Sequence, residues 1–334
     1  MRIHYDWRLA RVVDDERNIV DELEWDGPIT PTTLSKRLKI IQGGRNLPEV
    51  STLSERFPEA IIDETGALSD PHWPEFGDLE QVFQKATLEL AKMGVADSSG
   101  DLDRRLDMLV SAAQELRSSW TTSEARCVEW SGLFITEANL DSQRNDIPVA
   151  ISSSRTISEA AEKLGVNPPK HLPSDLEWSS MFSHANTVTR SSEILEQIEN
   201  AIREIASTHS PSLSALLGPI SAAKLISLAG GRERLARMPS GSLQVLGAHA
   251  AMSAHRRGAP PPKHGAVLFS MPQVSRSPRW VRGKIARYLA GKASIAVRVD
   301  NFEGERWDES KIEEINSEIE AIKDKFPRPP KRGV

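Results

Sequence analysis

The chain has little cysteine, few aromatic residues and no long apolar run. Cys127 is its single cysteine, which excludes an internal disulfide framework and any CxxC metal site and fits a reducing compartment. Because no run of roughly 18 apolar residues occurs, we expect no membrane span. The N-terminus, MRIHYDWRLARVVDDE, carries a charge every few residues instead of an apolar signal core, so we expect a cytoplasmic protein.

One segment of the chain has almost no acidic residues. Between positions 211 and 302 there are 14 Lys and Arg residues against only Glu233 and Asp300, a net charge of +12. The whole chain carries −5, so the remainder carries −17. Like charges within one compact domain repel each other unless a polyanion neutralises them. This distribution favours a nucleic-acid partner over a basic surface that is merely solvated.

The first part of the chain predicts a small α/β domain over residues 1–97. The runs MRIHYDWRLARVV and NIVDELEWDG predict strands joined by the polar turn DDER. The runs TTLSKRLKII and STLSERF predict helices, and SDPHWPEFGD predicts a proline-punctuated loop over residues 69–78.

The middle of the chain, residues 98–209, predicts a long antiparallel helical hairpin. Apolar residues recur in alternating steps of three and four over residues 102–134 and again over 178–205, which is the mean spacing of a coiled-coil seam. A polar tip segment at about 141–173 contains a predicted short helix near 157–164. Ordinary bundle packing also explains such stripes, but the narrow seam favours pairing with a second copy or a paralogue. The predicted self-association residues are Leu102, Leu106, Leu109, Leu116, Trp120, Leu195, Ile198 and Ile202.

The third part, residues 210–302, predicts a compact all-helical domain. LSALLGPISAAKLISLAGG reads as a helix rich in small residues, and ERLARM, SLQVLGAHAAMSAHR and RWVRGKIARYLAGKASIAVRV read as further helices. PPPKHGAVLF predicts a loop that leads into a short apolar run. Residues 303–334 predict a charged amphipathic helix, WDESKIEEINSEIEAIKDKF, and a disordered end, PRPPKRGV. The expected fold class is therefore mainly α.

The proline-rich loop carries residue types that suit RNA. Its three prolines restrict the backbone before binding, which lowers the cost of ordering it. Lys263 offers an ammonium group to phosphate, and His264 offers a flat ring on which an unpaired base stacks. Gly265 permits close backbone approach. A lone histidine is more often a packed residue, but its lysine and glycine neighbours favour base stacking.

A second basic cluster surrounds Trp280. Its candidate phosphate contacts are Arg279, Arg282, Lys284 and Arg287, and weaker candidates elsewhere are Lys224 and Arg237. On a single helix the three arginines lie roughly on one side, and Lys284 is displaced around the helix. This arrangement suits the phosphates of a bent RNA backbone. We expect Trp280 itself to be a packing residue.

The third part resembles the Nop domain of the box C/D ribonucleoprotein core proteins. The matching stretches, in the order of the family, are LSALLGPISAAKLISLAGGRERLARMPS, LQVLGA, GAPPPKHG, RWVRGKIAR and ASIAVRVD. The preceding helices, including CVEWSGLF, look like the coiled coil of the family, whereas the first domain matches in position only. The family motif adds Gly247 and Ala248 to the RNA-binding candidates. The chain is short and lacks a lysine-rich tail, so it resembles the archaeal type.

The resemblance implies a scaffold without catalytic residues, metal or cofactor. In the family, the first domain holds fibrillarin, a methyltransferase that uses S-adenosylmethionine, and the coiled coil pairs two scaffold copies. The Nop domain binds box C/D guide RNA at a kink-turn, together with a kink-turn-binding protein of the ribosomal-protein-like family. The assembly directs 2′-O-methylation of ribosomal RNA.

The chain departs from the family after Ala248. The family usually reads Glu-Lys-Ala-Leu-Phe-Arg-His there, whereas this chain reads HAAMSAH from His249 to His255. Contacts of that motif with the guide or its duplex therefore do not transfer residue by residue.

Two other hypotheses remain at this point. The first is an enzyme, such as a methyltransferase that acts alone, but the GG pairs at 43–44 and 230–231 lack the strand–loop–helix context of a nucleotide-binding loop. No zinc-ligand spacing or nucleophile–base pattern stands out either. The second is a spliceosomal relative that uses the same domain on a small nuclear RNA and has no role in methylation.

Overall fold

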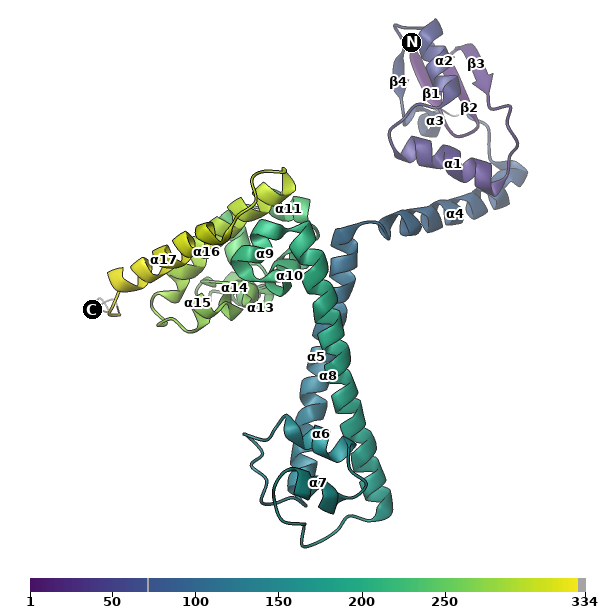
Figure 1. Cartoon of the computed structure of the whole chain (residues 1–334). Helices are drawn as coiled ribbons and strands as arrows, with labels where there is room; N and C mark the ends of the chain where they lie inside the picture. The colour runs from purple at the N-terminus through teal and green to yellow at the C-terminus, as the bar shows by residue number, and fades with distance from the viewer. Residues whose placement is uncertain (71, 330–334) are drawn as a thin grey trace. The chain divides into compact units, whose positions relative to one another are not determined.

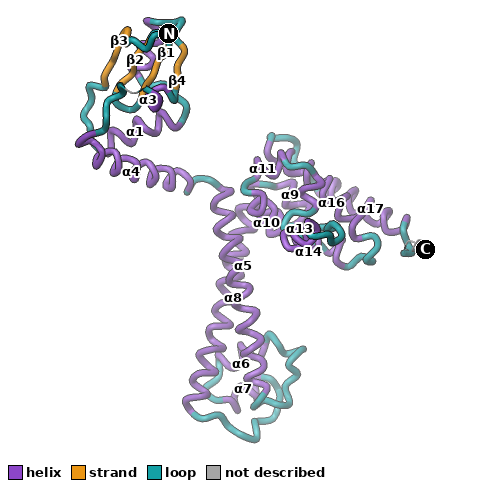
Figure 2. The backbone as a smooth tube through the Cα atoms, turned by 180° about the vertical axis from the view of Figure 1, so that it is seen from behind, coloured by secondary structure: helices purple, strands orange, loops and turns teal. Residues whose placement is uncertain are grey.

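The chain is mainly helical, with one small sheet. The computed structural model describes residues 1–70 and 72–329, and it separates the chain into two compact units, Met1–Gly100 and Asp101–Val334 (Figure 1). The strands, drawn in orange in Figure 2, all belong to the first unit.

The first unit is an α/β domain on a four-stranded sheet of order β3-β2-β1-β4. The strands are β1 (Arg2–Tyr5), β2 (Leu9–Val13), β3 (Ile19–Glu24) and β4 (Ile61–Asp63). Strand β2 pairs antiparallel with β1 and β3, and β4 pairs parallel with β1. The helices are α1 (Pro31–Gln42), α2 (Pro48–Arg56), α3 (Gly66–Ser69), the 3₁₀ helix η1 (Gly77–Leu79) and α4 (Glu80–Ser98).

Local chemistry explains how this unit differs from the predicted elements. The run MRIHYDWRLARVV forms two strands because Asp6 turns the chain: its side chain accepts a hydrogen bond from the backbone N–H of Arg8 at 2.6 Å. Both predicted helices are present, and the first begins at a capping box between Thr30 and Thr33. The predicted loop at 69–78 holds the end of α3 and the start of η1, and Pro71 lies outside the described residues.

The second unit contains the helical hairpin that the apolar stripes predict. Helix α5 (Leu102–Gly132) and helix α8 (Asp175–His209) pack against each other along their length. At 1.5 Å per residue they span about 47 and 52 Å. Asp101 and Ser174 cap their N-termini through side-chain oxygens.

The tip of the hairpin holds two short helices, where the sequence predicted one. Helix α7 (Ile157–Lys163) is the predicted one, and α6 (Asp146–Ser152) precedes it. Although the tip segment is polar in composition, it contributes to the core, because α6 buries Ile147 and Ile151 against α5 and α8. Glu124 of α5, only 4% exposed, accepts hydrogen bonds from the Arg144 guanidinium and ties the tip loop to the hairpin.

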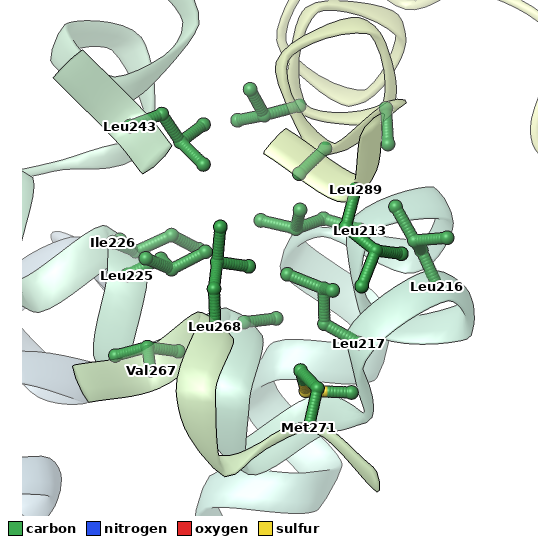
Figure 3. Packing of buried hydrophobic residues seen from close by; sticks show 14 of the residues in the cluster. Leu213, Leu216, Leu217, Leu225, Ile226, Leu243, Val267, Leu268, Met271 and Leu289 are labelled. Atoms are coloured by element: carbon green, nitrogen blue, oxygen red, sulfur yellow. The ribbon is translucent and has the colours of Figure 1, made fainter. Parts of the chain in front are cut away.

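The remaining helices form an all-helical domain that contains the predicted one at 210–302 and also includes α17. They are α9 (Pro211–Leu217), α10 (Pro219–Ala229), α11 (Arg232–Arg237), α12 (Ser240–Gln244), α13 (His249–Arg256), α14 (Ala266–Ser270), α15 (Pro272–Ser275), α16 (Arg282–Asn301) and α17 (Glu309–Lys325). Their apolar side chains converge on one core, in which Leu213, Leu225 and Leu268 meet Leu289 of α16 (Figure 3).

Three predicted helices are shorter in the structure than the apolar pattern indicated. The first is broken by Gly218 (φ +79°) into α9 and α10, which are bent by 116° relative to each other. The second is broken by Gly247 (φ +82°) into α12 and α13. Both glycines have a positive φ, which side-chain-bearing residues rarely adopt; Gly218 is the C-cap of α9, whereas α12 already ends at Gln244, three residues before Gly247. The third, α16, begins only at Arg282, so Arg279 and Trp280 precede it.

Among the described residues, no single helix is both long and apolar enough to cross a membrane. Only α9 and α10, taken together as a bent pair, meet the criteria of length and apolarity.

The predicted C-terminal helix is α17, which begins at the Asp308 cap and buries Ile315 and Ile319 in the core. The predicted disordered end falls partly on residues 330–334, which lie outside the described residues.

Candidate RNA-binding surface

The loop that carries Lys263, His264 and Gly265 is held in place by Gln244, the last residue of α12. The Gln244 side-chain amide donates a hydrogen bond to the Lys263 carbonyl at 2.6 Å, and the Gly265 amide donates one to the Gln244 carbonyl at 2.7 Å. Gln244 is only 8% exposed, so these bonds are well shielded from water. A Cβ atom at Gly265 would lie 1.9 Å from the Leu246 carbonyl oxygen, so only glycine fits.

The His264 ring lies flat on Phe269 of α14. The two ring centroids are 4.7 Å apart and the planes are inclined by 11°. The Lys263 side chain passes over Gly283 of α16, where a Cβ atom would lie 3.4 Å from it. The loop therefore lies next to the first turn of α16, and this places the proline-rich loop beside the second basic cluster.

Arg282 joins the two predicted clusters. Its Nε donates a hydrogen bond to the buried Ser277 carbonyl at 2.8 Å, and its guanidinium lies 5.6 Å from the Phe269 ring centroid. Arg279 and Arg287 are exposed, but Arg279 precedes the helix, so the three arginines do not share one helix as the pattern indicated. Together with Lys263, these arginines form what we call the basic surface.

The cations of the basic surface have no acidic partners. Among residues 1–70 and 72–329, none of Lys263, Arg279, Arg282 and Arg287 forms an ion pair. In the first unit, by contrast, Arg8 pairs with Asp6 at 2.7 Å and Arg37 pairs with Glu49 at 2.9 Å. Cations without acidic partners attract a polyanion.

Lys284 and Trp280 face a different part of the domain. The Lys284 Nζ lies 4.0 Å from the centroid of the Phe326 ring, a cation–π contact. The Trp280 Nε1 donates a hydrogen bond to the Phe326 carbonyl at 2.9 Å. Both side chains therefore contact Phe326, the residue that follows α17. Trp280 is 37% exposed and lies outside the buried core, so its expected packing role is limited to this contact. Lys284 is directed toward α17, not toward the loop.

The weaker RNA-binding candidates lie elsewhere in the domain. Lys224 is half-buried on α10, and Arg237 forms an exposed ion pair with Glu233 one turn away on α11. Gly247 and Ala248 form the turn into α13, and a Cβ at Gly247 would lie 3.2 Å from Leu228. The positive φ of Gly247 therefore explains why a glycine occupies this position.

The predicted self-association residues lie on facing sides of α5 and α8 of the same chain. Leu106, Leu195 and Ile202 are buried in the core, and the others are half-buried; these are Leu102, Leu109, Leu116, Trp120 and Ile198. The stripe is therefore filled by intramolecular packing, because each helix covers the apolar face of the other. A second copy would have to contact the outward faces of the hairpin.

Reasoning from the sequence missed two residues of this surface, Gln244 and Phe269. Gln244 is part of LQVLGA, a stretch that stands out only as part of a predicted helix and of the family resemblance. Phe269 follows His264 by five residues and reads as part of a short apolar run. Only the turn of the chain at Gly265 brings the two rings together.

Comparisons with known proteins show which family the chain belongs to. Residues 132–322 match the family model described as "Nop: snoRNA binding domain, fibrillarin". An uncharacterized NOP5 family protein of Methanocaldococcus jannaschii is 31% identical over 239 residues, which cover 70% of this chain and 57% of the relative. Nucleolar protein 56 of Caenorhabditis elegans is 37% identical over 130 residues, which cover 39% of this chain and 26% of the relative.

The chain spans little more than half the length of the first of these relatives and about a quarter of the second. A solved structure of a fibrillarin/Nop5p complex aligns with 91% of this chain and 97% of that chain, at 22% identity and a TM-score of 0.41. Because the Nop family model covers more than half of its residues, the chain belongs to the Nop family.

Proposed function

We propose that the protein is a non-catalytic scaffold of a box C/D guide ribonucleoprotein. The basic surface binds a kink-turn RNA together with its small ribosomal-protein-like partner. Residues 1–97 recruit fibrillarin, and the outward faces of the hairpin at 98–209 contact a second copy or a paralogue. The RNA-binding domain is residues 210–302, and residues 303–334 complete it with α17. The assembly directs 2′-O-methylation of ribosomal RNA.

The observation that carries this proposal is the set of unpaired cations around a rigid loop. A domain of net charge +12 with two acidic residues has few internal partners for its lysines and arginines. Lys263 directly precedes the stacked His264 ring, Arg282 lies 5.6 Å from the Phe269 ring of that stack, and Arg279 and Arg287 flank Arg282 in the sequence. Phosphate contacts of this kind position an RNA backbone, and the flat ring suits an unpaired base.

The fixed loop supports the same conclusion. Gln244 and the close approach at Gly265 set the loop conformation before any ligand arrives. Binding then costs less conformational entropy than it would with a mobile loop. A basic loop that only faced solvent would not need the two hydrogen bonds that fix it to Gln244.

Binding to a kink-turn RNA that is preloaded with its small protein tests the proposal. A charge variant, in which Lys263, Arg279 and Arg287 are all changed to Ala, should weaken affinity by about tenfold or more because three phosphate contacts are lost. The matched control changes Lys36, Lys85 and Lys92 of the first unit to Ala. These lysines are exposed, and the assay contains no fibrillarin for the first unit to bind. If the charge variant binds as tightly as the control, the proposal fails.

Isolation of the protein from its source cell separates the alternatives. Guide RNAs that co-purify together with fibrillarin support the scaffold. A spliceosomal RNA without fibrillarin identifies the protein as the spliceosomal relative. Methyl transfer from S-adenosylmethionine by the purified chain alone would instead identify an enzyme.

A further inference from the structure

We propose that Phe269 is a positioning residue of the RNA-binding surface: it fixes the His264 ring so that one unpaired base stacks on the outer face of the imidazole, while Arg282 holds the phosphate of that nucleotide. This inference rests on the proposed function of the basic surface. It names the part of the RNA that the loop receives.

The first argument is the exposure of Phe269. Its neighbours Val267 and Leu268 point into the core, whereas Phe269 is 39% exposed. The Phe269 amide donates a hydrogen bond to the Gly265 carbonyl at 3.0 Å, which closes the turn that directs the ring outward. A large apolar ring at the surface costs solvation free energy unless it is covered. Here one face is covered by His264.

The second argument is the geometry of the stack. Ring planes inclined by 11° at 4.7 Å are nearly parallel, within the range of an offset-stacked pair. Phe269 therefore occupies one face of the imidazole and sets the plane of the other. A base that stacks on His264 has only that opposite face available. The platform is one-sided and receives a single base.

The third argument is the position of Arg282. The hydrogen bond from Nε to the Ser277 carbonyl fixes the guanidinium, which lies 5.6 Å from the Phe269 ring centroid. A cation near an aromatic ring is stabilised by the π-electrons of the ring. Among residues 1–70 and 72–329 the terminal nitrogens of Arg282 form no ion pair, so they remain available for a phosphate.

These contacts define the class of ligand. A ring stack reads the face of a base and not its hydrogen-bonding edge, so recognition tolerates sequence changes. Purines present a larger face than pyrimidines and should bind more tightly at this position. The ligand is therefore an unpaired, preferably purine, nucleotide in a loop or bulge of the RNA.

The test uses the full chain with the preloaded kink-turn RNA, in which each unpaired nucleotide is replaced in turn by 2-aminopurine. With the wild-type protein, fluorescence at one position should be quenched by stacking. Phe269→Leu should weaken affinity about fivefold to tenfold and remove that quenching. Phe269→Tyr keeps the ring and should restore both. Phe302→Leu, an exposed phenylalanine at the far end of α16, is the matched control and should have no effect.

RNA that lacks the base at the quenched position completes the experiment. Removal of the base should weaken binding to the wild-type protein, and Phe269→Leu should then cause no further loss. An equal loss with and without the base would overturn the inference, because Phe269 would then act on something other than stacking. Wild-type behaviour of Phe269→Leu in every assay would also overturn it. The charge variant would still bind weakly in both cases, so the proposed function would stand.

Discussion

Gly265 shows how strictly the loop depends on one absent side chain. Its Cβ position lies 1.9 Å from the Leu246 carbonyl oxygen and 3.0 Å from the Val245 carbonyl carbon. Both are backbone atoms, which cannot rotate away as a flexible side chain does. A residue with a side chain would separate the loop from the end of α12 and break the hydrogen bond to Gln244.

We therefore expect Gly265→Ala to lower the free energy of unfolding by about 1–3 kcal/mol, as overpacking does, and to weaken RNA binding. Chemical denaturation and the kink-turn binding assay measure the two effects. Gly241→Ala is the control, because a Cβ at Gly241 meets no atom within 4 Å. Equal stability and affinity for the two variants would show that the loop tolerates a side chain.

At the same scale, the sequence singles out the outer residues of the proposed site but not the inner ones. Lys263 and His264 stand out because a lysine and a flat ring lie next to a glycine in a proline-rich loop. Gln244 and Phe269 are ordinary residues within helical patterns, and their importance comes from a tertiary contact. Lys284 looks equivalent to its neighbouring arginines in sequence, and only the position of Phe326 distinguishes it.

At the scale of elements, the hairpin depends on the buried residues of its stripe. Leu106 is fully buried where α5 meets the helical domain. Leu106→Ala should lower the free energy of unfolding by about 2–5 kcal/mol, because the lost contacts leave a cavity. Met108→Ala, two residues away and 64% exposed, should change it by about 0.5 kcal/mol or less. Denaturant titration of both variants measures the contrast, and equal losses would mean that the stripe is not the core of the hairpin.

A polar network joins the base of the hairpin to α11. Asp103 accepts a hydrogen bond from the His209 ring at 2.7 Å and another from the Arg232 amide at 2.8 Å. Burial raises the pKa of the Asp103 carboxyl, but these hydrogen bonds and the electrostatic influence of His209 and Arg232 outweigh burial, so the pKa lies below its ordinary value of 3.8. A carboxyl whose pKa is lower in the folded than in the unfolded chain stabilises the fold at pH values above the unfolded-state pKa. This stabilisation is lost as the pH falls through the folded-state pKa.

We therefore expect Asp103→Asn to be less stable than the wild type near neutral pH, and the difference to shrink as the pH falls below the ordinary carboxyl value. Chemical denaturation at a series of pH values measures this, with Asp324→Asn on the exposed face of α17 as the control. A stability difference that stays constant down to about pH 2 would contradict the assigned role of the carboxylate.

Helix periodicity explains which elements the sequence predicts. The long stripes of α5 and α8 predict their helices well because the period repeats over many turns. The breaks at Gly218 and Gly247 were missed because the apolar pattern continues through both glycines. Helix α6 was missed because a seven-residue helix with a proline inside a polar segment shows no period, and it is stabilised by packing on α5 and α8.

At the scale of the whole molecule, the proposed RNA binding rests mainly on the uneven distribution of charge along the chain. The segment with net charge +12 lies within the second unit, and the first unit pairs several of its arginines with nearby acids. Family membership and the mainly helical fold both follow from patterns in the sequence. The partners of residues 1–97 do not follow in the same way, because no charge or motif in that domain singles out a contact surface.

The salt dependence of RNA binding tests the central claim most directly. The logarithm of the binding constant for the preloaded kink-turn RNA should fall linearly with the logarithm of salt concentration, because bound phosphates release counterions. In the charge variant, that slope should be shallower by about two to three units, one for each phosphate contact removed. A slope identical to that of the wild-type chain would contradict the account, because Lys263, Arg279 and Arg287 would then contact no phosphates.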